Sequence, residues 1–231
     1  MKMKLVVTRI TILLCGFLLF QISKSRTFQF FGGLTARVNT KQKVVALTFD
    51  DAPSPYVNKV LAILKEKQIK ATLYEIGKAI EQYPEEARSI VEEGMEVGNH
   101  SYSHERMVLK SLSFINTEIQ NTNRLIKSSG YQGEITFRPP NGKKLFGLPW
   151  YLLQHNIKTI MWDIEPDTYV TGNSDTIVKY TLSHVQPGSI VLLHPFCDKE
   201  FVADREALPK IIEGLLSKGY RFVTISELLK Y

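Results

Sequence analysis

Residues 43–53 read KVVALTFDDAP, a run of apolar and β-branched residues that ends in two adjacent carboxylates, Asp50 and Asp51. Such a run, closed by a small residue and Pro53, is typical of a buried strand followed by a tight turn. About fifty residues later, the sequence HSYSH places His100 and His104 four residues apart. Adjacent carboxylates repel each other unless one binds a cation, and imidazoles are neutral ligands that zinc prefers. The two clusters together predict one metal site.

Short β-rich runs alternate with helical stretches from Lys43 onward. The sequence predicts seven strands: Val44–Phe49, Thr72–Ile76, Met95–Asn99, Ile135–Arg138, Thr159–Ile164, Ser189–His194 and Arg221–Thr224. It predicts six helices: Pro55–Lys67, Lys78–Glu92, Ser111–Ser129, Leu148–Gln154, Asp175–His184 and Ala203–Ser217. This alternation favours a mostly parallel sheet with helices outside, either a barrel or a doubly wound sheet.

Polar residues gather where the predicted strands end. These residues are Asp50, Asp51, His100, Arg138, Asp163 and His194. In parallel α/β folds the carboxyl ends of the strands meet at one edge, which is where active sites are built. We therefore expect these side chains to lie around one site.

The chain has 231 residues, 44% of them hydrophobic, which is enough for one catalytic domain. Its net charge of +6 comes mostly from residues 1–27, which hold five basic residues and no acidic one. The rest of the chain holds 24 basic and 23 acidic residues, which argues against nucleic-acid binding and against substrate capture by net charge.

The N-terminal segment, residues 1–27, contains the apolar stretch Ile10–Ile22 between basic residues. This pattern is typical of a secretory signal and is short for a full membrane span. No small-x-small cleavage site stands out near residues 23–25, so an uncleaved membrane anchor is the alternative. We expect residues 28–42 to be a linker or an opening strand, and residues 43–231 to form the catalytic domain.

Two cysteines, Cys15 and Cys197, are present, and removal or membrane burial of the first leaves the second without a partner. We expect no intramolecular disulfide. Cys197 follows His194-Pro195-Phe196, and we interpret it as a small apolar residue near a loop, with a nucleophilic role as the alternative.

Each polar motif alone also has a purely structural explanation. The acidic pair could cap a turn or a helix, the two histidines could be surface groups, and Arg138 before two prolines could form a structural ion pair. His194 could be a core histidine, and the acids of residues 162–167 could belong to a loop. Taken in order, however, the five segments resemble the polysaccharide deacetylase family, carbohydrate esterase family 4, from about Lys43 to the C-terminus. The stretches KATLY at 70–74 and EGMEVGNH at 93–100 continue the resemblance.

The resemblance implies a distorted, incomplete (β/α) barrel of about seven strands with outer helices. It implies metal-dependent removal of acetyl groups, most often N-acetyl, from a polysaccharide such as peptidoglycan or chitin. By position, Asp50 would be the general base, His194 the general acid, and Arg138 the residue that holds Asp50. The metal ligands would be Asp51, His100 and His104.

Three residues are expected on the substrate and oxyanion side of the site: Asn141, Leu192 and Trp162. Asn141 stands where the family usually has an aromatic residue, so a main-chain oxyanion donor is still expected but an aromatic wall is not. Ala52 replaces the usual Gly. The fourth motif departs most, because the acid that tunes the histidine is out of step; we expect Asp167 in that role, with Glu165 as the alternative.

The expected cofactor is a divalent metal, foremost Zn²⁺, with Co²⁺ and Ni²⁺ as alternatives because an Asp-His-His set suits several ions. The expected partner is a polysaccharide, with no nucleic acid, and with membrane contact only through residues 1–27 if they are uncleaved. An extracellular or cell-envelope location follows. The sequence indicates no oligomeric state. Two other functions stay open: a catalytically silent glycan-binding protein of the same fold, and another metal-dependent hydrolase such as a phosphoesterase.

Overall fold

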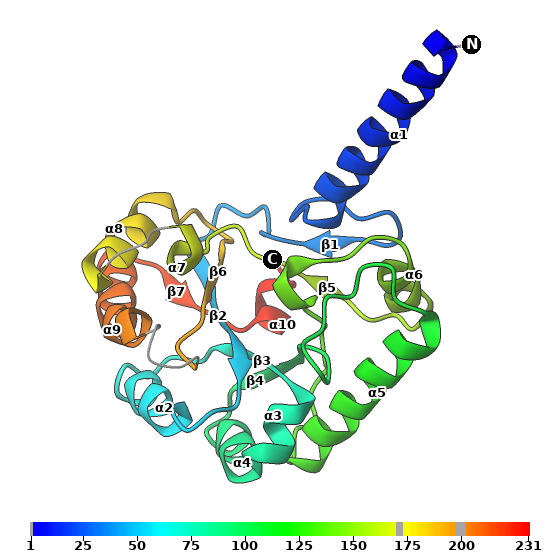
Figure 1. Cartoon of the computed structure of the whole chain (residues 1–231). Coiled ribbons are helices and arrows are strands. Elements are labelled where there is room, and N and C mark those ends of the chain that lie inside the picture. Colours follow the sequence, from blue (N-terminus) through cyan, green and yellow to red (C-terminus); the bar gives the residue numbers. More distant parts are fainter. Residues whose placement is uncertain (1, 170–172, 197–201) are drawn as a thin grey trace.

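The structure is a computed structural model that describes residues 2–169, 173–196 and 202–231 (Figure 1). Cys197 lies outside the described residues. The described strands are β1 (Leu34–Thr35), β2 (Val44–Ala52), β3 (Thr72–Glu75), β4 (Glu96–Asn99), β5 (Thr159–Ile160), β6 (Ile190–Leu193) and β7 (Arg221–Phe222). The helices are α1 (Lys2–Ser23), α2 (Val57–Glu66), α3 (Gly77–Gln82), α4 (Pro84–Glu92), α5 (Leu112–Ser128), α6 (Gly147–Gln154), α7 (Pro166–Tyr169), α8 (Ser174–His184), α9 (Val202–Ser217) and α10 (Ile225–Leu228), with a 3₁₀ turn η1 at Pro140–Gly142.

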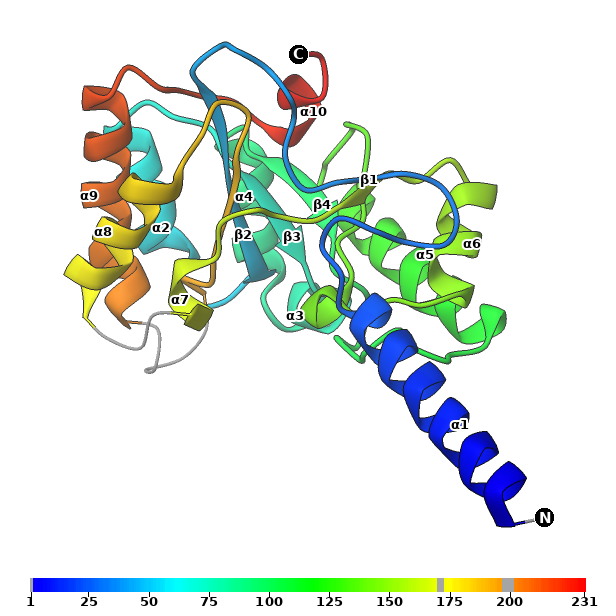
Figure 2. The same ribbon diagram turned by 90° about the horizontal axis from the view of Figure 1, so that it is seen from above.

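The strands form two parallel sheets that single bridges join into a ring. The larger sheet has the order β4-β3-β2-β6, with β7 paired to the first residues of β2, and the smaller sheet pairs β1 with β5. Phe137 bridges both Asn99 and Thr159, and Ile164 bridges Val191 in β6. Helices surround this ring (Figures 1 and 2). The expected distorted, incomplete barrel with outer helices is therefore confirmed.

Two predicted elements differ from the structure for reasons that involve proline. Residues 135–138 form only the single bridges of Phe137 instead of a strand, because Pro139 and Pro140 that follow lack the N–H groups a ladder needs. The predicted helix Lys78–Glu92 is two helices, α3 and α4, because Pro84 cannot donate to the preceding turn and instead begins α4. Residues 28–42 contain β1, which pairs with β5.

The alternation of side chains along β2 decides what reaches the barrel interior. Val45, Leu47 and Phe49 pack in the cluster under the outer helices, whereas Val44 and Ala46 pack in the interior cluster. Asp50 continues the inward series because successive strand residues point to opposite faces. The register of β2 against β3 shifts between Phe49 and Ala52, and Asp51 has a φ of 63°. This bulge turns Asp51 away from simple alternation, so that both carboxylates face the same histidines.

Helix α1 projects away from the domain (Figures 1 and 2). Its window Val6–Ser23 is long and apolar enough to cross a membrane, by length and composition, and only 6% of that window is buried. The chain immediately after α1 is instead fixed to the domain by Lys144, which is 1% exposed. The Lys144 backbone N–H donates to Ser23 O at 2.9 Å, and its ammonium group donates to Ser25 O.

Candidate metal and catalytic site

Asp50 is held by a fully buried arginine. Arg138 Nη1 donates to Asp50 Oδ1 at 2.8 Å and to Thr48 Oγ1 at 2.9 Å, and the guanidinium lies 4.1 Å from the centre of the Tyr74 ring. Burial disfavours the charged form of Asp50, but the charges of Arg138, His100 and His194 outweigh it and hold the pKa of Asp50 below its ordinary value. Asp50 is therefore a fixed carboxylate that can accept a proton.

Three potential metal ligands converge beside Asp50. His104 Nε2 lies 3.3 Å from Asp51 Oδ1, and His100 Nε2 lies 3.8 Å from the same oxygen. Two ligand atoms each about 2.1 Å from a tetrahedral zinc ion are about 3.4 Å apart, so these separations fit one ion. Burial and the charge of His100 lower the pKa of His104, which favours the neutral imidazole that a metal requires.

The histidine loop is clamped by its own hydrogen bonds. His100 Nδ1 lies 2.8 Å from Arg138 O, which leaves Nε2 to face the carboxylates. The Glu118 carboxylate, on α5, accepts from the backbone N–H groups of Tyr102 at 3.0 Å and Ser103 at 2.8 Å. Sequence reasoning missed Glu118, although the residue lies on the apolar face of α5, three positions after the buried Ile115. A buried acid on such a face is the signal that could have found it.

Backbone strain is concentrated in the same place. Three residues of the site that are not glycines have a positive φ: Asp51 at 63°, His104 at 59° and Asn141 at 54°. Positive φ values in such residues cost free energy and persist where surrounding contacts impose them. Ala52 is not one of the positive-φ residues, so its replacement of the family's usual Gly carries no such cost.

His194 belongs to the same site and is hydrogen-bonded to two carboxylates. Its Nδ1 is 2.6 Å from Asp167 Oδ2, and its backbone N–H donates to both Asp167 and Asp204 at 3.0 Å. Glu165, the alternative to Asp167, instead accepts from Arg26 and from Trp162 Nε1. Asp204 lies in the first turn of α9 and was missed, because nothing in the sequence near it points to residue 194.

The side chains of His194, Asp167 and Asp204 shift one another's pKa values. Burial alone would lower the pKa of His194, but the hydrogen bond and charge of Asp167, with the charges of Asp50 and Asp51, raise it to about 10. Burial and the neighbouring Asp167 raise the pKa of Asp204 to about 8. Because two carboxylates in contact do not both ionise readily, the pair favours the proton on Asp204 and the charge on Asp167.

A pocket of about 430 Å³ joins these groups. Its lining comprises Lys24, Arg26, Asp50, Asp51, His100, His104, Asn141, Gly142, Lys143, Met161, Trp162, Glu165 and His194. Leu192 lies in β6, is 1% exposed and packs in the interior cluster, outside this lining. Asp163 serves the fold, because it accepts hydrogen bonds from Ser189 Oγ and the Ile190 N–H, both at 2.8 Å.

A family model described as polysaccharide deacetylase matches residues 37–160, which is more than half of the chain. The chain belongs to the polysaccharide deacetylase family. Among curated members, it is 34% identical over 194 residues to the peptidoglycan-N-acetylmuramic acid deacetylase PdaC of Bacillus subtilis, covering 83% of this chain but 40% of that protein. It is 31% identical over 205 residues to a peptidoglycan-N-acetylglucosamine deacetylase of Bacillus cereus, covering 87% of this chain and 94% of that one.

Solved structures of the family share the fold. A peptidoglycan N-acetylglucosamine deacetylase superposes with a TM-score of 0.79 at 30% identity, over 84% of this chain and 91% of that chain. A family pseudoenzyme from Bacillus anthracis superposes with a TM-score of 0.76 at 31% identity, over 84% of this chain and 68% of that one. The fold alone therefore does not establish catalysis, and the side chains of the site must decide it.

Substitution of a proposed metal ligand and of the proposed base should affect metal binding differently. His104→Ala should weaken Zn²⁺ binding more than about 100-fold, because it removes one of three converging donors. Asp50→Asn should retain the metal, since Arg138 holds residue 50 and the ligand set is untouched. Metal content after dialysis, measured by mass spectrometry, checks both, with His184→Ala on the exposed face of α8 as the matched control. Equal zinc content in His104→Ala and the control would contradict this ligand set.

The pKa of His194 is expected to depend on Asp167. In Asp167→Asn the carboxylate that contacts Nδ1 is lost while burial remains, so the pKa of His194 should fall below about 10, even though Asp204 then ionises more readily. An NMR titration of the histidine Cε1–H signals measures this change. Asp175→Asn, which removes an exposed carboxylate paired with Lys210, is the control and should leave His194 unchanged. An unchanged His194 pKa in Asp167→Asn would show that other groups set it.

Proposed function

We propose that this protein is a metal-dependent hydrolase that removes acetyl groups, foremost N-acetyl, from a cell-envelope polysaccharide. One observation carries the proposal: an arginine-held carboxylate and a carboxylate-bound imidazole line the same pocket as a three-ligand metal set. A base, an acid and a Lewis acid around one cavity are what amide hydrolysis requires.

Asp50 supplies the base. A water molecule attacks the acetyl carbonyl carbon and loses a proton to the Asp50 carboxylate, whose orientation Arg138 fixes through Oδ1. Its lowered pKa keeps Asp50 ionised at neutral pH, so it is ready to accept that proton. A divalent cation held by Asp51, His100 and His104 would polarise the acetyl carbonyl and make the water more acidic.

His194 supplies the acid. The carbon–nitrogen bond can break only if the departing amine nitrogen gains a proton, and the imidazolium of His194 can donate it from Nε2 while Nδ1 stays bound to Asp167. Acetate and a free amine are the products. Asp204, which contacts the same backbone N–H, helps to keep the Asp167 carboxylate in place. We infer that Asp167, and not Glu165, tunes the acid.

Substrate contacts come from the turn after Arg138 and from Trp162. The backbone N–H of Asn141 is our candidate oxyanion donor, because Asn141 lines the pocket beside the metal ligands. Trp162 is 5% exposed and lines the pocket, so its edge can contact the acetyl group or sugar. Leu192 supports this wall from the interior cluster rather than by direct contact.

The proposed metal follows from the chemistry of its ligands, and the proposed substrate follows from the relatives. One carboxylate and two imidazoles favour Zn²⁺, with Co²⁺ and Ni²⁺ also suited. The relatives named above act on peptidoglycan, one on N-acetylmuramic acid and one on N-acetylglucosamine residues, so we propose a peptidoglycan substrate for this chain. We propose that the catalytic domain comprises the predicted residues 43–231 together with β1, which pairs with β5.

We further propose that α1 is retained as a membrane anchor. Removal of residues 1–27 would take away Lys24 and Arg26, which line the pocket, and the Ser23 and Ser25 carbonyls that Lys144 binds. A buried lysine without hydrogen-bond acceptors costs free energy, so the folded domain is more stable when this segment is present to accept from Lys144. An N-terminus rich in Lys and Arg on the cytoplasmic side would place the domain outside.

The deacetylase proposal predicts metal-dependent acetate release. The full chain in detergent should release acetate from N-acetylated chitooligosaccharides or purified peptidoglycan, lose this activity with a chelator, and regain it with Zn²⁺. Asp50→Asn should reduce kcat by about 10²–10⁴-fold, because the proton acceptor is lost. No acetate from the zinc-loaded wild type on either substrate would favour the catalytically silent glycan-binding function instead.

The anchor proposal predicts an uncleaved N-terminus. Mass spectrometry of protein from cell membranes should find residues 1–27 retained, and alkaline carbonate should not extract the protein. The double variant S23A/S25A, which introduces a small-x-small site, is the control that shows cleavage can be detected. A soluble wild-type product that begins after residue 23 would contradict the anchor.

A further inference from the structure

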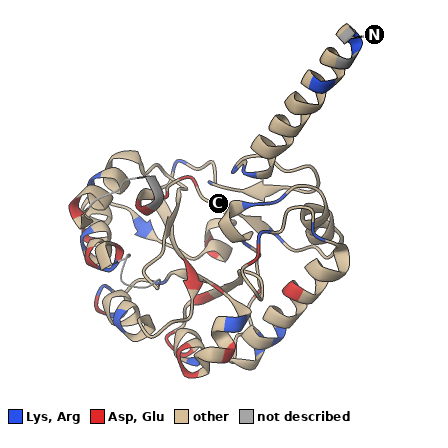
Figure 3. Cartoon of the chain, viewed as in Figure 1, with Lys and Arg blue, Asp and Glu red and all other residues tan. Residues whose placement is uncertain are grey.

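The pocket lining combines acidic and basic side chains. Asp50 and Asp51 lie among the metal ligands, which we call the metal end. Lys24 and Arg26 from the segment after α1, with Lys143, form what we call the basic end, where Glu165 pairs with Arg26. Figure 3 shows basic residues at the base of α1 and acidic residues on the central strands. Lys24 and Arg26 belong to the basic N-terminal segment, and Lys143 joins them from a part of the chain that is nearly neutral in total. A neutral acetylated glycan would not require the basic end.

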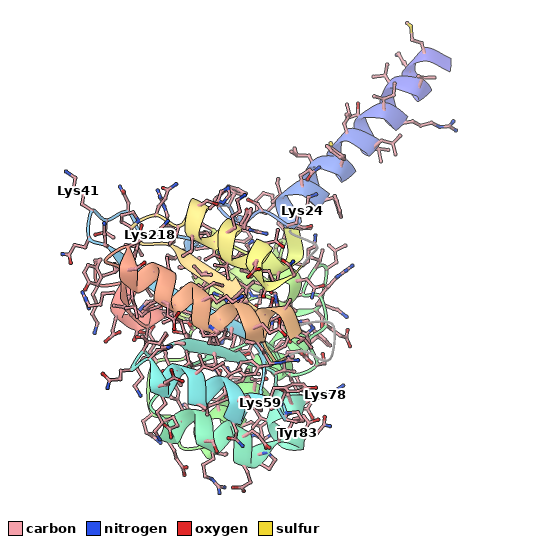
Figure 4. The ribbon with its side chains drawn as sticks, turned by 90° about the vertical axis from the view of Figure 1, so that its left-hand side faces the viewer. Lys24, Lys41, Lys59, Lys78, Tyr83 and Lys218 are labelled. Atoms are coloured by element: carbon pink, nitrogen blue, oxygen red, sulfur yellow. The ribbon has the colours of Figure 1, made fainter. Side chains whose placement is uncertain are left out.

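The basic end is part of the folded structure. Lys144 binds the chain on both sides of Lys24, through Ser23 O and Ser25 O. Arg26 forms an ion pair with Glu165, and its guanidinium lies 4.9 Å from the centre of the Trp162 ring. Figure 4 shows Lys24 where α1 meets the domain. Lys24 is therefore placed at the pocket by contacts before and after it.

Two lysines of the basic end approach the same aromatic ring. The Lys24 and Lys143 ammonium groups lie 4.9 and 5.1 Å from the centre of the same Phe20 ring, and thus within about 10 Å of each other. In the described part of the chain, the ion pairs include neither lysine. Burial and the charges of Lys24 and Arg106 lower the pKa of Lys143, which shows that the three cations repel one another. An anion between them would relieve that repulsion.

We propose that Lys24 and Lys143, with Arg106 beside them, bind an anionic group on the glycan, a carboxylate or a phosphate, while the acetylated sugar lies at the metal end. Arg106 contributes through Asn141, because its Nε donates to Asn141 Oδ1 at 3.2 Å and Asn141 lines the pocket. This inference rests on the proposed deacetylase function. Such a subsite would let a chain without net basic charge in its domain select charged glycan, since a pocket focuses the field of a few cations.

The same geometry places the subsite near a membrane. Lys24 directly follows the apolar window of α1, which ends at Ser23. If α1 spans the bilayer, the basic end of the pocket lies at headgroup level, where both glycan anions and lipid phosphates are present. The carboxylate or phosphate is therefore to be sought on glycan close to the membrane, and lipid headgroups are the competing source of the same chemistry.

The test measures binding to the metal-free full chain in phosphatidylcholine nanodiscs. Calorimetry compares a neutral chitotetraose, an alternating N-acetylglucosamine and N-acetylmuramic acid tetrasaccharide, which carries carboxylates, and a chitotriose 1-phosphate. The wild type should bind at least one charged ligand about tenfold or more tightly than the neutral one. Whichever charged ligand shows the larger preference identifies the anion as carboxylate or phosphate.

The variants separate charge from other effects. In K24Q/K143Q the preference for the charged ligand should fall close to one, and K24R/K143R should restore it. The control K41Q/K218Q removes two lysines on the side of the domain remote from Lys24 (Figure 4) and should keep both the preference and the acetate release of the wild type. An equal preference in the wild type and in K24Q/K143Q would overturn the subsite.

Two further outcomes are distinguishable. If phosphatidylglycerol in the nanodiscs abolishes charged-glycan binding in the wild type, the lysines are a lipid headgroup site and the glycan subsite is wrong. If the wild type binds charged glycan with the expected preference but releases no acetate when loaded with zinc, the subsite stands and the deacetylase proposal fails.

Discussion

The site depends on the buried pair of Arg138 and Asp50. Arg138 has no exposed surface. The Asp50 carboxylate balances its charge, the Thr48 hydroxyl accepts a hydrogen bond from it, and the rings of Tyr74 and Trp162 lie beside the guanidinium. Removal of either partner would leave an uncompensated charge in the interior, which typically costs about 3–5 kcal/mol. The same arginine offers its main-chain carbonyl to His100. One residue therefore fixes both the proposed base and a proposed metal ligand, so the positions of these two groups are not independent.

The residues that meet at the pocket could be predicted from the sequence because each lies in or just after a short, recognisable run. Asp50 follows the apolar part of β2 and His194 follows β6, and the order of the motifs, which resembles the family, implied the barrel. The sequence left Glu165 as an alternative to Asp167 for the acid that contacts His194. The two residues are two positions apart in a loop, and no local sequence pattern shows which side chain points toward the histidine. The two helices at Pro84 and the missing strand at 135–138 are cases where proline overrode periodicity.

The supporting contacts could not be predicted, because they join residues far apart in the chain. Glu118 clamps a loop fifteen positions earlier, and Asp204 reaches back ten positions to the His194 backbone. Lys144 binds a segment about 120 residues away, which sequence reasoning had separated from the domain at residue 27. Net charge was misleading for the same reason. A count over the chain does not record that Lys24 and Lys143 share one aromatic ring.

The clasp that Lys144 makes on Ser23 and Ser25 leaves almost no flexible chain between α1 and the barrel. The end-to-end length of a flexible linker grows roughly as the square root of its residue number, and that length sets how far a tethered enzyme reaches. Here the linker adds almost nothing, so the reach is set by the domain itself. If α1 anchors the protein as proposed above, the pocket reaches only glycan that lies within the width of the domain from the bilayer, whatever the thickness of the wall beyond it.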